Sequence, residues 1–231
     1  MRIIVTIPAY NEEKTIAAVI KRIHEVMKSN RYNYNILVVD DGSNDDTAKV
    51  AKKSNAIVYS HPKNYGLAET FKTEIKKALE LKADVIVHID ADKQYQPEEI
   101  PKLIKEIKNG YDLVLGSRFD GKIENMSLLK RLGNRVFSRV ISNITKTKIS
   151  DAQTGFRAFT REVAEKIGII SYHTYTQEQI IKAIKQKFRV GEVPIYFAKR
   201  IGSKSRLISN PFEYALKAWI NIIRFTGTMS L

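Results

Sequence analysis

The sequence predicts an α/β protein in which helices cover both faces of a mostly parallel, Rossmann-like sheet. Short apolar runs that are typical of strands alternate with amphipathic helical periods through the first half of the chain. Three of these runs end directly in acidic clusters, at residues 7–13, 38–47 and 88–94. Parallel strands place their carboxyl ends at one edge of the sheet, and ligands bind at that edge in open α/β sheets. The pattern therefore predicts one acidic ligand site at this edge.

Two spacings define the elements of the first half. Runs rich in valine and isoleucine predict strands at residues 2–7, 36–39, 56–59, 84–89 and 112–115. Apolar residues at intervals of three and four predict helices at residues 13–28, 46–53, 66–81 and 97–108. Pro97 suits the first turn of the last helix, because the missing N–H has no helical partner there.

The second half is predicted to hold fewer strands and a long basic helix. Helices are expected at residues 127–144, 161–168 and 177–186, strands at 156–159 and 189–197, and an amphipathic C-terminal helix at 210–231. No repeat or linker interrupts the chain. We therefore expect a single domain over residues 1–231, with a nucleotide-binding half at 1–115 and an acceptor half at 116–209.

The composition narrows the classes of partner. The chain has 231 residues, no cysteine and a formal net charge of +14. The absence of cysteine excludes disulfides and thiolate metal sites. The charge suits nucleic acid, an anionic membrane surface or phosphorylated molecules. No aromatic-basic sheet motif or helix-turn-helix pattern is present, which argues against nucleic acid. No secretory signal or membrane-spanning run is recognised, so we expect a cytoplasmic protein.

Asp90-Ala91-Asp92 is the sharpest chemical signal. In an extended chain residues i and i+2 point the same way, and two carboxylates at a strand end repel unless a cation lies between them. Oxygen donors favour Mg²⁺ or Mn²⁺, and Mg²⁺ commonly combines one or two carboxylates with substrate phosphates. Gln94 could add a neutral oxygen. The alternative is a pair of surface acids in a loop.

The other two acidic clusters suit nucleoside recognition. Tyr10 could stack on a base, and Glu12 could accept hydrogen bonds from base or ribose, although a tyrosine in a turn often only packs. Asp40 suits ribose or base recognition, as acids do in dinucleotide folds. The following Asp41-Gly42-Ser43 is also good turn chemistry with no ligand at all.

Taken together, the motifs resemble a known enzyme family. The motifs are Pro8-Ala9-Tyr10-Asn11-Glu12-Glu13, Val39-Asp40-Asp41-Gly42-Ser43, Asp90-Ala91-Asp92 and Gly116-Ser117-Arg118. They resemble family 2 glycosyltransferases of GT-A fold. The second half resembles the branch of polyprenyl-phosphate sugar synthases, such as dolichyl-phosphate mannose synthase, through residues 151–157, 191–195 and 200–205.

The resemblance implies a role for individual residues. Those implied to bind the nucleotide sugar are Pro8, Tyr10, Glu12, Val38, Asp40, Asp90, Ala91, Arg118, Arg200 and Lys204. Asp92 and Gln94 would hold the metal on the diphosphate, and Arg131 with Arg135 would reach the acceptor phosphate. The catalytic set would be Asp92, Arg118, Arg200 and Asp151. The chain departs from the family at Ala68 and Glu74, where glycines are frequent, and at Arg135, where serine is frequent.

The implied function is inverting transfer of a sugar from GDP-mannose or a UDP-sugar to a polyprenyl phosphate. The basic helix and apolar tail would place the enzyme on the cytoplasmic face of an anionic membrane, with a membrane-anchoring partner as one option. One alternative is transfer to a hydroxyl with Asp151 as base. Another is a catalytically silent nucleotide-sugar-binding subunit. His88 is expected to point away from Asp90 into the core.

Overall fold

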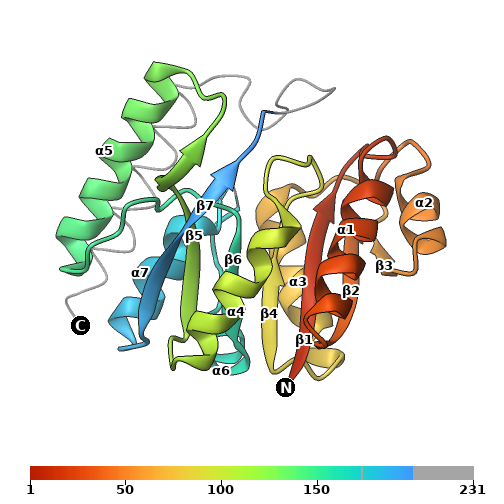
Figure 1. Cartoon of the computed structure of the whole chain (residues 1–231), viewed down its shortest axis with the longest axis horizontal. Helices are drawn as coiled ribbons and strands as arrows, with labels where there is room; N and C mark the ends of the chain where they lie inside the picture. Colours follow the sequence, from red (N-terminus) through yellow and green to blue (C-terminus); the bar gives the residue numbers. More distant parts are fainter. Residues whose placement is uncertain (173, 200–231) are drawn as a thin grey trace.

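The computed structural model describes residues 1–172 and 174–199, which form one mixed sheet between two layers of helices (Figure 1). The strands are β1 (Arg2–Ala9), β2 (Asn33–Asp40), β3 (Ile57–Ser60), β4 (Val85–His88), β5 (Leu113–Ile123), β6 (Arg157–Thr160) and β7 (Val190–Phe197). The helices are α1 (Ile16–Ser29), α2 (Thr47–Lys53), α3 (Leu67–Glu80), the 3₁₀ turn η1 (Pro97–Glu99), α4 (Ile100–Lys108), α5 (Leu128–Thr145), α6 (Arg161–Lys166) and α7 (Thr176–Lys185).

The sheet has the strand order β3-β2-β1-β4-β6-β5-β7. All neighbours are parallel except β6, which runs antiparallel to both β4 and β5. The prediction of a mostly parallel sheet is therefore confirmed. The reversal of β6 matters for function, because it brings the loop before β6 to the same edge as the carboxyl ends of the parallel strands.

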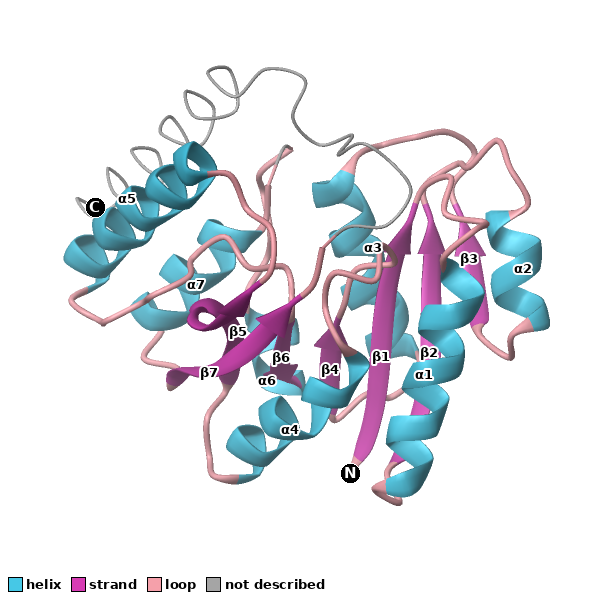
Figure 2. Cartoon of the chain, turned by 45° about the horizontal axis from the view of Figure 1, so that its top comes forward, coloured by secondary structure: helices cyan, strands magenta, loops and turns pink. Residues whose placement is uncertain are grey.

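Two apolar clusters hold the helices on opposite faces of the sheet. One contains side chains of α1 and α4 with alternate residues of β1, β2 and β4, including Ile3, Val5 and Ile7. The other contains side chains of α3, α5, α6 and α7 with the intervening strand residues, such as Ile4 and Ile86. Figure 2 shows α1 and α4 in front of the sheet and α3 behind it. Because side chains of a strand alternate between faces, near-continuous apolar runs are what a doubly covered sheet requires.

The elements match the expected ones closely, with one extension. β5 was expected to stop at residue 115 but continues to Ile123, through an irregularity in its pairing with β7 between Ser117 and Lys122. The polar stretch lacks the apolar alternation of a strand. Gly121 permits the extension, because a Cβ there would lie 1.9 Å from the main-chain oxygen of Ile195.

None of the helices in the described ranges is both long enough and apolar enough to cross a membrane. The predicted helix at 210–231 lies outside these ranges.

Candidate active site

The three strand ends that carry the acidic clusters lie side by side. Ala9 pairs with Asp40 across β1 and β2, and the N–H of Asp41 donates to Ala9 O at 2.8 Å. On the other side of β1, the N–H of Ile89 donates to Thr6 O at 3.0 Å. The parallel register therefore gathers the loops after β1, β2 and β4 at one edge of the sheet.

The first two loops are tied to each other by reciprocal hydrogen bonds. The N–H of Asn11 donates to Ser43 Oγ at 2.8 Å, and Asn11 Oδ1 accepts from the N–H of Asn44 at 2.8 Å. The N–H of Glu12 donates to Thr47 Oγ1, also at 2.8 Å. Asn11 has a positive φ of 53°, a conformation that asparagine tolerates better than most residues. These bonds fix the positions from which Tyr10 and Glu12 can meet a ligand.

The residues expected around the nucleoside differ in access. Pro8, Tyr10 and Glu12 are half-buried at the edge. Asp40 is 4% exposed, and its Oδ1 accepts from the N–H of Ser43 at 3.2 Å, so the expected turn forms. The side chain of Val38 is fully buried in the core on the α1 face.

Asp41, a neighbour of the expected site, organises the loop that borders it. Asp41 Oδ1 accepts from the N–H of Tyr65 at 2.9 Å, and Oδ2 accepts from the N–H of Gly66 at 2.8 Å. His61 Nδ1 lies 2.8 Å from Asp41 Oδ1. One buried carboxylate thus fixes residues 61–66 against the end of β2. The Asp-Gly-Ser turn indicated only local chemistry, so sequence reasoning missed this role.

Asp92 and Gln94 lie in a turn next to the end of β7. The N–H of Gln94 donates to Asp92 Oδ1 at 3.0 Å, and the main chain of Gln94 accepts from the N–H of Ala198 at 2.9 Å. Gln94 Nε2 also lies 3.4 Å from Ala198 O. The chain therefore passes the predicted metal position just before residue 200. Arg200 and Lys204, expected to cover the phosphates, lie outside the described residues.

The donor set at this turn fits a magnesium or manganese ion that shares its shell with phosphates. It offers a carboxylate and an amide, both oxygen-bearing and half-buried. Within residues 1–172 and 174–199, no group of three or more His, Asp or Glu side chains could hold a metal by itself. A cation here would depend on oxygen atoms from a ligand, as Mg²⁺ commonly does.

The expectation for His88 is wrong, because it points toward Asp90. His88 Nε2 lies 3.7 Å from Asp90 Oδ1, and His88 Nδ1 lies 2.8 Å from Glu74 Oε2. Residues 88 and 90 are separated by two positions, so strand alternation places them on the same face. Burial lowers the pKa of His88, but the charges of Glu74 and Asp90 outweigh it and raise the pKa to about 9. The imidazole is therefore a buried cation at neutral pH.

Arg118 and Asp151 form a buried, two-pronged ion pair. Arg118 Nε donates to Asp151 Oδ2 at 2.6 Å, and Arg118 Nη2 donates to Oδ1 at 2.8 Å. Asp151 is fully buried, Arg118 is 5% exposed, and the N–H of Arg118 also donates to Oδ2 at 3.0 Å. Burial alone would lower the pKa of Arg118, yet Tyr95 and Asp151 raise it, so the guanidinium stays charged. The antiparallel β6 is what brings residue 151 to this edge.

Glu192 supports that pair from below and was not singled out in the sequence. Its two carboxylate oxygens accept from the N–H groups of Ser150 and Asp151, at 2.7 and 3.0 Å. The loop before β6 is therefore anchored to β7 by a side chain whose position in a strand gave no sign of this role.

The two arginines expected at the acceptor phosphate lie on α5 near Arg118. Arg135 is exposed, and its guanidinium lies 5.4 Å from the ring centre of Phe119, whose other neighbour is Arg118 at 6.0 Å. Arg131 is half-buried, and its Nε is buried with no hydrogen-bond partner among the described residues. The structure thus places Arg135 close to Arg118 through one shared aromatic ring.

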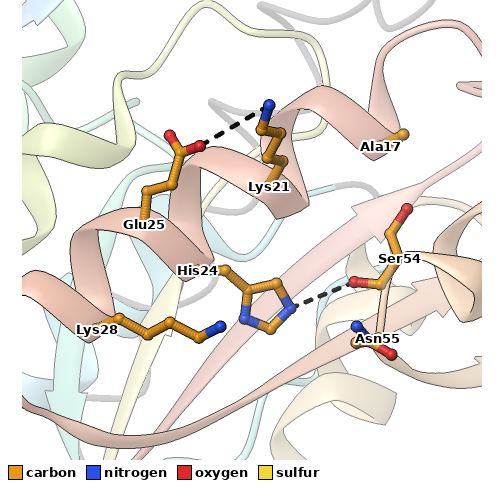
Figure 3. A pocket seen from close by; sticks show the side chains of 7 residues that line it. All are labelled: Ala17, Lys21, His24, Glu25, Lys28, Ser54 and Asn55. Carbon is orange, nitrogen blue, oxygen red and sulfur yellow. Dashed lines mark hydrogen bonds and ion pairs between the residues drawn. The ribbon is translucent and has the colours of Figure 1, made fainter.

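The best-formed hollow in the described part of the chain is not at this edge. It has a volume of about 460 Å³ and lies between α1 and the end of α2, lined by His24, Lys28, Ser54 and Asn55 among others (Figure 3). His24 is already bonded to Tyr34 Oη at 2.7 Å and lies 3.2 Å from Ser54 O. Because α1 and α2 run back from the carboxyl edge, this hollow belongs to the opposite end of the sheet.

Acidic and oxygen donors at the carboxyl edge of a mostly parallel sheet, with arginines beside them, define a class of nucleotide-dependent transferases. Comparison with known proteins makes the assignment specific. The chain belongs to glycosyl transferase family 2, whose family model matches residues 4–168.

Relatives in that family agree on the lipid and differ in the sugar. The chain is 36% identical over 214 residues to the UDP-N-acetylglucosamine–dolichyl-phosphate N-acetylglucosaminyltransferase of Methanococcus voltae, covering 82% of each protein. It is 35% identical over 225 residues to the dolichol-phosphate mannosyltransferase of Pyrococcus furiosus, covering 93% of this chain and 62% of that one.

A solved structure confirms the expected GT-A fold. The structure of glucosyl-3-phosphoglycerate synthase from Mycobacterium tuberculosis, in complex with Mn²⁺, UDP and phosphoglyceric acid, matches with a TM-score of 0.75 at 19% identity. The match covers 97% of this chain and 78% of the other. At this identity the likeness shows the fold alone.

Proposed function

We propose that this glycosyltransferase moves a sugar from a nucleotide diphosphate sugar to a polyprenyl phosphate, with inversion at the anomeric carbon. The observation that carries the proposal is the pairing of Asp151 with Arg118. Both oxygens of Asp151 are engaged by the guanidinium, in a fully buried position. A hydroxyl acceptor would need a carboxylate base, and Asp151 is the residue considered for it.

A phosphate acceptor needs no such base. With a second pKa near ~6, a phosphate monoester is largely dianionic at pH 7. Its oxygen forms the bond to the anomeric carbon while the bond from that carbon to the diphosphate breaks. The acceptor has to be positioned, and arginine forks match phosphate geometry. The buried, unpartnered Nε of Arg131 and the exposed Arg135 beside Phe119 suit that task.

The donor would occupy the edge formed by β1, β2 and β4. Pro8, Tyr10, Glu12 and Asp40 would face the nucleoside, and Asp90 with Ala91 the sugar side. Asp92 and Gln94 would hold Mg²⁺ or Mn²⁺, which supplies charge to stabilise the leaving diphosphate. Arg200 and Lys204 would add positive charge over the phosphates. Residues 1–115 would thus serve the nucleotide and 116–209 the acceptor, within one domain.

Membrane association follows from the outer face of α5. Four apolar side chains on it are exposed: Leu128 by 81%, Leu129 by 79%, Leu132 by 63% and Val136 by 50%. Exposed basic residues, Lys130, Arg135 and Arg139, lie on the same helix. An apolar stripe with flanking positive charge is typical of helices that lie in the interface of anionic bilayers. We place the enzyme on the cytoplasmic face, with or without a separate anchoring partner.

One assay tests the transfer. The protein is incubated with Mg²⁺ or Mn²⁺, a polyprenyl phosphate and each common GDP- and UDP-sugar in turn, and products are identified by mass. A sugar-phospholipid should form with one donor class, and Asp92→Asn should abolish it while the exposed Asp46→Asn should not. Nucleotide release without any lipid product, or transfer only to hydroxyl acceptors, would contradict the proposal.

A second assay tests the membrane surface. Flotation with anionic vesicles should recover the wild type, and Leu129→Ser with Leu132→Ser should reduce recovery. Ile57→Ser, at an exposed apolar position on the edge strand β3, is the matched control and should float like the wild type. Equal flotation of all three proteins would remove α5 from the membrane contact.

A further inference from the structure

A chain of polar side chains runs from the core of the α3 face to the donor edge. Glu74 on α3 and His88 on β4 are both 0% exposed, and Tyr175, just before α7, is 1% exposed. His88 Nδ1 lies 2.8 Å from Glu74 Oε2, and His88 Nε2 lies 2.7 Å from Tyr175 Oη. At the outer end, the same Nε2 lies 3.7 Å from Asp90 Oδ1.

Packing leaves these three side chains little freedom. The ring of Tyr175 stacks on Phe71 with centres 3.7 Å apart, and His88 meets both rings edge-on, at 5.3 Å from each. The fully buried Arg157 lies against the other side of Tyr175, with its guanidinium 5.1 Å from the ring centre. A histidine between a carboxylate and a hydroxyl, wedged among rings, has one accessible orientation.

The opposite side of Asp90 is closed by main chain. A Cβ placed on Gly155 would lie 3.3 Å from both carboxylate oxygens of Asp90, which is tighter than ordinary contact. The N–H of Gly155 donates to Tyr95 Oη at 3.0 Å, so this segment is itself held in place. Asp90 is therefore confined between His88 and the Gly155 main chain, while its side chain stays 34% exposed toward the edge.

Burying a charged pair costs free energy that apolar side chains of the same size would not incur. A cluster that only filled the core would have no reason to reach an edge carboxylate. This one extends from α3 to a residue at the donor edge, and it brings in a segment 87 residues away in sequence through Tyr175.

We propose that Glu74, His88 and Tyr175 are positioning residues that set the orientation of the Asp90 carboxylate toward hydroxyl groups of the donor sugar. The inference rests on the proposed function in that it takes the ligand to be a nucleotide sugar. In this arrangement Glu74 fixes the imidazole through Nδ1, Tyr175 fixes it through Nε2, and the positive imidazole draws Asp90 into one rotamer. Bound nucleotide alone does not need this arrangement, but its attached sugar does.

The test compares affinity for a nucleotide diphosphate with affinity for its sugar. Calorimetry with Mn²⁺ measures UDP against UDP-glucose and UDP-N-acetylglucosamine, and GDP against GDP-mannose. Tyr175→Phe removes one hydroxyl and keeps the stacked ring. His88→Gln removes the cation and keeps a polar side chain. Each should weaken binding of the sugar nucleotide by about 10-fold, as loss of an outer partner commonly does, and leave the bare nucleotide unchanged.

The chain supplies a matched control. His24 pairs with Tyr34 Oη at 2.7 Å, the same kind of contact, at the opposite end of the sheet. Tyr34→Phe and His24→Gln should lower thermal stability while leaving both affinities as in the wild type. A role that is only structural would make the two pairs of variants behave alike.

The outcomes separate the two proposals. If Tyr175→Phe retains the wild-type ratio of the two affinities, the inference is overturned, and this holds even if His88→Gln fails to fold. If the wild type binds a sugar nucleotide but transfers nothing to polyprenyl phosphate, the proposed function fails while the affinity ratio still decides the inference. If it binds no sugar nucleotide, both fail.

Discussion

Replacing His88 by leucine should cost about 3–5 kcal/mol of folding free energy, because it leaves the carboxylate of Glu74 buried without its cation. Glu74 is fully buried, and His88 Nδ1 is bonded to it at 2.8 Å. Burial raises the pKa of Glu74, and the ion pair with His88 opposes that rise. Without the imidazole the carboxyl group must either stay charged in an apolar layer or take up a proton, and both are unfavourable.

The size of the loss is best judged against a double replacement. Glu74→Leu with His88→Leu removes both charges among Phe71, Ile75 and Ala78, and paired charges replaced by apolar side chains of similar volume are often neutral in stability. The double variant should therefore lie within about 1–2 kcal/mol of the wild type, the residual reflecting the unpaired hydroxyl of Tyr175. The coupling between the two sites would then exceed about 2 kcal/mol.

Urea unfolding of the wild type, both single variants and the double variant measures these differences. For a chain of this size each kcal/mol shifts the midpoint of thermal unfolding by roughly 2–4 °C, so His88→Leu should melt about 6–20 °C below the wild type. The reasoning is refuted if His88→Leu costs under about 1 kcal/mol, or if the two single losses simply add in the double variant.

Four further outcomes follow from the same structure. The folded-state pKa of His88, about 9, exceeds the ordinary 6.5, so its contribution to stability is complete below pH 6.5 and is lost as the pH rises through about 9; urea midpoints across this range should show the loss in the wild type and not in the Glu74→Leu, His88→Leu variant. Gly121→Ala should lower stability by more than about 2 kcal/mol in urea unfolding, since its Cβ would overlap Ile195 O, whereas Gly133→Ala, in open space on α5, should raise it slightly. Gly155→Ala should raise the KM for the sugar nucleotide in steady-state assays, because the added methyl group presses on Asp90. Arg118→Lys should lower kcat at least about 10-fold with folding retained, since an ammonium group cannot reproduce the paired contacts to Asp151.

The elements and the acidic edge could be predicted because they depend on local periodicity. α1, α3 and α5 begin and end within three residues of their expected bounds, and the three acidic loops lie together because parallel strands leave them no alternative. The antiparallel direction of β6 could not be predicted in this way. Apolar alternation is the same in both directions, and direction is decided by the connections across the whole sheet.

The polar interior was harder to foresee, and part of it was within reach. Glu74 falls on the buried side of α3, three residues after Phe71 and four before Ala78, which is an unusual place for a carboxylate. His88 ends an otherwise apolar strand. A buried acid and a buried base in adjacent elements indicate a pair, and correct use of the two-residue repeat would have turned His88 toward Asp90. Tyr175 carried no comparable signal, because its contact spans 87 positions.

Asp151 shows what a side chain's partner adds to its chemistry. Loss of kcat in Asp151→Asn was expected to indicate a catalytic base, yet the structure gives a second reason for the same loss. Asp151 holds Arg118 with both oxygens, so the amide would release the guanidinium whether the acceptor is a hydroxyl or a phosphate. The informative quantity is the pH dependence of kcat. A base would impose an acidic limb that Asp151→Asn removes, whereas a positioning carboxylate that stays paired would leave the shape of the profile unchanged and lower its height.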